Sequence, residues 1–194
     1  YWIQRVSDPF TSPSIFRNTQ YIATCTQAFA ANGTRFGTIV LIPIFLKEVN
    51  GLDPIYVGLV LFPGALAIGL LSQRAGDWAD RRGPREPVIV GTTLLTLGNL
   101  ATAWFAGGSP WGVTAGMGIV GLGFAFTQTP LLSTASQVLP EEHTSSGMGL
   151  FMMILFVGGA FGVALGVTTA ELQPADVSGL FGLPFPAPTY GNAM

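Results

Sequence analysis

Hydrophobic residues fill five long stretches of this chain, and short polar or charged segments separate them. A helix that crosses a membrane needs about 20 apolar residues, and each stretch is close to that length or longer. No charge occurs between Glu86 and Glu141. That interval is too long for one span and divides at the turn-forming sequence 107–110. The pattern predicts an all-α integral membrane protein with helices at about 21–45, 56–73, 88–105, 111–138 and 148–170.

The composition supports the same class. Hydrophobic residues make up 49% of the 194 residues and charged residues only 9%, whereas soluble domains carry about 25% charged residues. No long basic tract suggests nucleic-acid binding. Cys25 is the sole cysteine, so we interpret it as a small buried hydrophobic residue. The chain contains no His-Glu-x-x-His pair, no Gly-x-Ser-x-Gly elbow, no phosphate loop of the Gly-Lys-Ser type and no cluster of metal ligands. We therefore expect no enzyme activity, cofactor or metal.

Lysine and arginine in the loops predict the orientation, because cytoplasmic loops of membrane proteins are enriched in both. One side of the predicted membrane carries Arg5, Arg17 and the arginines between 74 and 85, and the other carries only Lys47. We therefore expect residues 1–18 to be a cytoplasmic connector and residues 19–170 to form the transmembrane bundle. Residues 171–194, rich in proline, would be an extracytoplasmic loop.

The densest group of charges lies between the second and third stretches, in the sequence Gly-Asp-Trp-Ala-Asp-Arg-Arg-Gly-Pro-Arg of residues 76–85. We expect a tight cytoplasmic loop in which Gly76 and Gly83 permit turns. Asp80 would lie at a helix terminus and accept backbone N–H groups or pair with arginines. Such a loop can act as a conformational latch, made of Gly76, Asp80, Arg81, Arg82, Gly83 and Arg85. The alternative is that the arginines only hold the loop in the cytoplasm.

Arg35 is the second unusual feature, because it lies near the middle of the first predicted helix. An arginine there costs roughly 2.5–3.5 kcal/mol on insertion scales. Gln27 and Arg35 share one helix face, and Asn32 flanks that face. We expect these residues, with Gln128 beside Pro130 in the fourth helix, to face a substrate or ion cavity. Alternatively, Arg35 snorkels or pairs structurally, and Gln128 bonds a neighbouring helix.

Two other patterns predict helix packing. Gly158, Gly162 and Gly166 form consecutive small-xxx-small steps that let another helix approach closely. Thr92, Thr96 and Asn99 share one face of the third helix, where we expect contacts with neighbouring helices.

The sequence Gly-x-x-x-Asp-Arg-x-Gly at 76–83 resembles the loop signature of the major facilitator superfamily of secondary transporters. The segments 41–43, 46–49 and 58–64, together with Asp-Arg-Arg-Gly-Pro at 80–84, resemble the C-terminal half of its fourteen-span drug:proton antiporters. The resemblance implies five helices of a six-helix half, with the final helix beyond this chain. It also implies proton-coupled export of drugs or other small hydrophobic compounds from the bacterial inner membrane, by alternating access.

The partners implied by this resemblance are the lipid bilayer, a small-molecule substrate, protons and the N-terminal half of the same protein. Two alternatives stay open. A metabolite carrier of the same superfamily would share the fold, and a non-transporting membrane scaffold or truncated subunit would share the spans.

Overall fold

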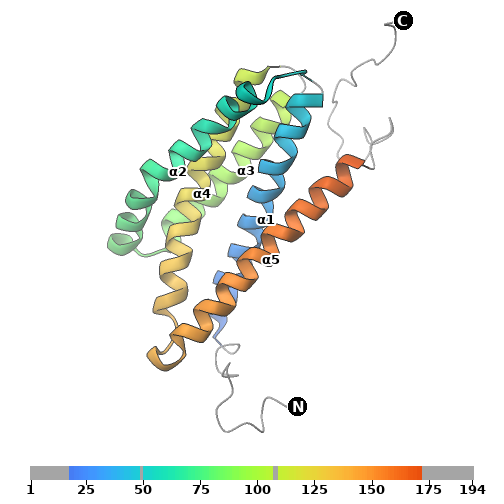
Figure 1. The fold of residues 1–194 in the computed structure, drawn as a ribbon. Coiled ribbons are helices and arrows are strands. Elements are labelled where there is room, and N and C mark those ends of the chain that lie inside the picture. Colours follow the sequence, from blue (N-terminus) through green and yellow to red (C-terminus); the bar gives the residue numbers. More distant parts are fainter. Residues whose placement is uncertain (1–17, 49, 107–108, 172–194) are drawn as a thin grey trace, which may run out of the picture.

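The computed structural model describes residues 18–48, 50–106 and 109–171, and nearly all of them are helical (Figure 1). All five long helices are long and apolar enough to cross a membrane, which confirms the predicted all-α membrane fold. The elements in chain order are α1 (Thr19–Glu48), α2 (Pro54–Arg82), α3 (Arg85–Ala106), α4 (Pro110–Gln137), the short 3-10 helix η3 (Glu141–His143) and α5 (Thr144–Glu171).

Successive helices run in opposite directions, so the connections alternate between the two ends of the bundle (Figure 1). The start of α1, the α2–α3 turn and η3 share one end. The side chain of Asn18 fixes part of this end. Its Oδ1 accepts the backbone N–H groups of Gln20 and Tyr21, and its Nδ2 donates to the carbonyl of Val138 at 3.3 Å. The side chain therefore caps α1 and ties its start to the end of α4.

The helices extend beyond the predicted apolar stretches, most clearly in α2. The expected span ends at Gln73, but the helix continues to Arg82. Ala75 and Ala79 are buried in these extra turns, so the helix keeps one packed face while its other faces become charged. Hydropathy marks the part of a helix inside the hydrocarbon layer, whereas the helix itself ends where Gly83 and Pro84 interrupt it.

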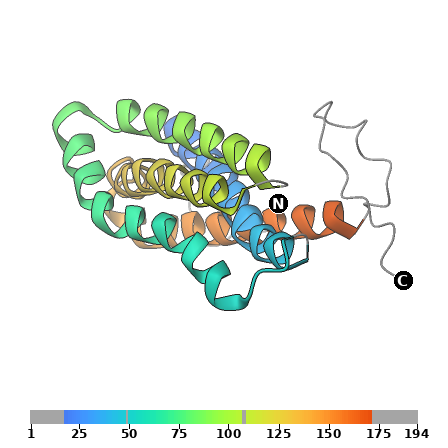
Figure 2. The same cartoon turned by 90° about the horizontal axis from the view of Figure 1, so that it is seen from above.

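Helix α4 lies in the middle of the bundle, with α3 on one side and α2 on the other (Figure 2). Glycines permit this close approach. A Cβ on Gly121 would lie 2.2 Å from the carbonyl oxygen of Gly64 in α2, and one on Gly123 would lie 2.4 Å from the backbone nitrogen of Leu95 in α3. Backbone therefore meets backbone at both interfaces, and α2, α3 and α4 form one tightly packed group.

Helix α5 packs along α1 in the same manner (Figure 1). A Cβ on Gly162 would lie 1.9 Å from the carbonyl oxygen of Gly33, and one on Gly158 would lie 2.5 Å from that of Phe29. The close helix approach predicted from the glycine spacing is confirmed at these two positions. Gly166 instead faces the side chain of Leu41.

Candidate functional site

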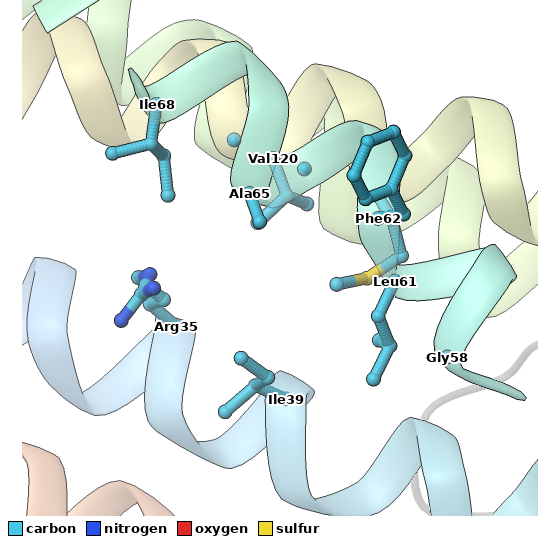
Figure 3. A pocket seen from close by; sticks show the side chains of 11 residues that line it. Arg35, Ile39, Gly58, Leu61, Phe62, Ala65, Ile68 and Val120 are labelled. Carbon is cyan, nitrogen blue, oxygen red and sulfur yellow. The ribbon is translucent and has the colours of Figure 1, made fainter. Parts of the chain in front are cut away.

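A cavity of about 280 Å³ lies between α1, α2 and α4 (Figure 3). Arg35 contributes the only charged side chain among its lining residues, and the rest are apolar or glycine. From α1 the cavity is lined by Arg35 and Ile39. From α2 it is lined by Gly58, Leu61, Phe62, Gly64, Ala65 and Ile68, and from α4 by Met117, Val120 and Gly121.

Small residues and helix divergence create this space. Helices α1 and α2 have few contacts with each other, whereas both contact α4. A Cβ on Gly58 would meet no atom within 4 Å, so the α2 wall is open at that point. Apolar clusters flank the cavity, one including Leu46 and Val113 near the α1–α2 connection and the other including Leu95 and Phe124.

Arg35 is half-buried, and its side chain extends into the space between α1 and α2 (Figure 3). Its Cζ lies 4.3 Å from the ring centroid of Phe124 and 5.4 Å from that of Phe36. Contacts of a guanidinium with aromatic rings at this distance are cation–π interactions. Within the described part of the chain Arg35 makes no ion pair or hydrogen bond. The structure thus places Arg35 on a cavity wall, and its part in binding remains a prediction.

The other predicted cavity residues form hydrogen bonds between helices. Asn32 is buried and donates to Oε1 of Gln128 at 3.0 Å, which links α1 to α4. Gln27 donates to Oγ1 of Thr92 at 2.7 Å, which links α1 to α3. The structure therefore brings Asn32 and Gln128 together. Arg35 lines the central cavity, whereas Gln27 lines a second hollow of about 540 Å³ between α1, α3 and α4.

The predicted packing face of the third helix is confirmed at two of its three residues. Thr92 accepts the bond from Gln27, and Asn99 accepts a bond from Thr38 of α1. Thr96 is exposed and donates to the carbonyl of Thr92 in its own helix. Polar side chains at the α1–α3 and α1–α4 contacts thus form hydrogen bonds with one another where water is scarce.

The charged cluster 76–85 is mainly helix, which corrects the expectation of a loop. Gly76 lies inside α2 and forms no turn, and a Cβ there would be in ordinary contact with a methyl group of Thr129 at 3.5 Å. Of these two glycines, only Gly83, with a φ of 86°, has the positive φ that glycine readily adopts. Asp80 lies near the C-terminal end of α2, where carbonyl groups are free and N–H groups are not. It therefore cannot cap the helix as expected.

The turn after α2 is braced by contacts that the sequence did not reveal. Glu86 accepts a hydrogen bond from Nε1 of Trp78 at 3.3 Å and lies 3.9 Å from the guanidinium of Arg82. The Trp78 ring also packs edge-on against Phe126 of α4, with centroids 5.7 Å apart. Arg82 and Glu86 lie on either side of the turn and not on one helix, so the i,i+4 rule of helices does not predict their pairing. Nothing local indicates the Trp78–Phe126 contact. These contacts connect the end of α2 with the start of α3 and with the middle of α4.

The remaining charges of the cluster are exposed. Asp77, Asp80, Arg81 and Arg85 are all accessible, and among the described residues none of them makes a salt bridge. Arg85 borders the second hollow, beside the start of α3. No group of three His, Cys, Asp or Glu side chains in the described ranges is arranged to hold a metal ion.

The described residues thus form a bundle of membrane-length helices with a mostly apolar cavity and a charged helix end. The family model of the Major Facilitator Superfamily matches residues 3–163, and the chain therefore belongs to that superfamily. It is a multi-pass protein of the plasma membrane.

Three of the curated relatives are proteins of Mycobacterium tuberculosis. The chain is 31% identical over 169 residues to the multidrug resistance protein Stp, covering 84% of this chain and 31% of the relative. It is 30% identical over 166 residues to a multidrug resistance protein B homolog, covering 83% and 30%. It is 25% identical over 160 residues to the drug efflux pump JefA, covering 82% and 32%. The chain thus spans about a third of the length of these relatives.

Proposed function

We propose that this chain is the C-terminal part of a secondary active transporter that exports drugs or other small hydrophobic compounds in exchange for protons. The observation that carries the proposal is the apolar cavity between α1, α2 and α4, with the guanidinium of Arg35 in its wall. Drug-sized ligands bind in pockets that are mostly apolar and contain few polar groups. The names of the relatives, which include multidrug resistance and drug efflux, support the same substrate class.

Alternating access suits the packing of the bundle. Backbone contacts join α2 and α3 to α4, and they join α5 to α1. Such interfaces resist deformation, so the helices would move as groups. In this superfamily the binding site lies at the interface of two repeats near the bilayer midplane. The chain would supply one wall of that site, and the N-terminal half would supply the other. The cavity lining contains no carboxylate, so proton-carrying groups would belong to the rest of the protein.

The charged end of α2 would act as the conformational latch. Trp78 contacts Glu86 and Phe126 at this end, and the turn at Gly83 directs α3 back into the membrane. Asp80 and Arg81 are exposed on the last turns of α2, at the predicted cytoplasmic face. Charge pairs between these side chains and the rest of the transporter would form in one conformation and break in the other, with Arg82 and Arg85 able to contribute.

Drug accumulation in cells tests this function. A drug-sensitive bacterial strain would express the intact protein or carry an empty vector, and intracellular drug would be measured with and without a protonophore. We expect lower accumulation with the protein, and loss of that difference when the proton gradient collapses. Unchanged accumulation together with altered release of a metabolite would favour a metabolite carrier. Unchanged behaviour in both assays would favour the scaffold alternative.

A further inference from the structure

Arg35 has donors that nothing in the described part of the chain satisfies. A guanidinium carries five N–H donors in a planar fork. Arg35 contacts the rings of Phe36 and Phe124, and these contacts give its N–H groups no oxygen acceptor. Carboxylates of the described residues are not within ion-pairing distance of Arg35. A half-buried cation that is held in place by aromatic rings, with its donors free, is suited to receive an anion that enters the cavity.

The cavity is larger than a single acidic group needs. Its volume of about 280 Å³ compares with about 30 Å³ for one water molecule in the liquid. The side chains around the space include Ile39, Leu61, Phe62, Ile68 and Met117, which offer an apolar surface with one flexible thioether. An aspartate or glutamate from another segment would pair with Arg35 but would leave most of this surface uncovered.

From this combination we infer that the cavity binds amphipathic organic acids, with the acidic group on Arg35 and the apolar body against α2 and α4. The inference rests on the proposed function and deepens it, because it names the substrate class. Arginine suits this role better than lysine, since its planar fork bonds both oxygens of a carboxylate. The surrounding apolar wall strengthens such a bond by excluding water.

A pair of dyes that share one body tests the inference. Dansylglycine carries a free carboxylate on a neutral aromatic body, and its methyl ester carries none. Fluorescence polarisation would measure the binding of each dye to the purified intact protein. We expect the wild type to prefer the acid, and Arg35→Gln to weaken binding of the acid by about tenfold or more while changing binding of the ester less than twofold. Arg35→Lys should retain part of the preference.

A steric variant locates the site independently of charge. Gly58 lies on the cavity wall with no atom within 4 Å of its built Cβ, so we expect Gly58→Leu to occupy part of the space. Gly69 lies on the same helix, is equally open and does not line the cavity, so Gly69→Leu is the matched control. We expect Gly58→Leu to weaken binding of both dyes and Gly69→Leu to leave binding unchanged. This comparison stays informative if Arg35→Gln fails to fold.

Three results would overturn the inference: equal affinity of the wild type for acid and ester, an equal loss of both in Arg35→Gln, or unchanged binding in Gly58→Leu. An equal loss would mean that Arg35 pairs with a group of the protein. Dye transport into proteoliposomes separates this outcome from failure of the proposed function. If the wild type binds the acid selectively but transports neither dye, the binding site stands and the export proposal fails.

Discussion

The effect on stability of a substitution at the α1–α5 interface can be predicted quantitatively, because backbone atoms of the two helices are in direct contact there. We consider the substitution Gly162→Ala. The new Cβ would lie 1.9 Å from the carbonyl oxygen of Gly33, whereas ordinary contacts begin at 3.4 Å. A backbone oxygen in a helix cannot rotate away, so α1 and α5 must separate by more than 1 Å at this point. The neighbouring contacts, such as that of Gly158 with Phe29, would loosen as well.

The expected cost follows from packing energetics. Adding a methyl group to a well-packed site destabilises a protein by about 1–3 kcal/mol, and replacing glycine by alanine within a helix favours the helix by about 1 kcal/mol. Gly149→Ala is the matched control, because Gly149 lies in the same helix with nothing within 4 Å of its built Cβ. Both variants gain the same helix propensity, so the difference between them isolates the packing cost. We expect Gly162→Ala to be about 1–3 kcal/mol less stable than Gly149→Ala.

Cys25 provides the assay. It is buried among residues of α1, α4 and α5, so separation of α1 from α5 exposes its thiol. In a version of the intact protein whose only cysteine is Cys25, reaction with a thiol-specific fluorophore during heating in detergent would report the midpoint of unfolding. Gly162→Ala should unfold several degrees below Gly149→Ala. Equal midpoints would mean that α1 and α5 are not in close contact at Gly162, and the packing of the bundle would need revision.

Three further predictions concern the turn, the interhelical bond and the latch. Gly83→Ala should destabilise the protein by about 1–3 kcal/mol, measured as a lower unfolding midpoint, because alanine disfavours the φ of 86°. A double-mutant cycle of Asn32→Ala and Gln128→Ala should give a coupling of about 0.6 kcal/mol in detergent unfolding, and zero coupling would refute their bond. Asp80→Asn should slow dye export without lowering the amount of protein in the membrane, and export at the wild-type rate would argue against the latch.

The sequence predicts the number and the order of the helices because burial in lipid requires long apolar stretches. It underestimates α2, since the turns between Gln73 and Arg82 are charged on their exposed faces and become recognisable as helix only through the buried Ala75 and Ala79. The glycine spacing of α5 predicts a close contact but not its partner. That partner, around Gly33 in α1, is determined by tertiary structure.

The candidate site is predictable only in part. Arg35 stands out in the sequence because a charge in an apolar span is costly. Its ring partner Phe124 does not stand out, since the chain contains 14 phenylalanines and most of them are ordinary apolar residues of spans. The cavity itself depends on the divergence of α1 from α2 and on the open space at Gly58, neither of which leaves a periodic signal. Sequence patterns identify the unusual residue, and the fold identifies what surrounds it.

Drug-dependent proton movement is the most direct measurement of the proposed exchange. The intact protein would be reconstituted into vesicles that contain rhodamine B and a pH-sensitive dye, with an outward gradient of the drug. We expect the vesicle interior to acidify as the drug leaves and protons enter, and Arg35→Ala, inserted to the same level, to lose most of this signal. Absence of drug-dependent acidification with the wild type would contradict proton-coupled export, and an unchanged signal with Arg35→Ala would contradict a role for the cavity.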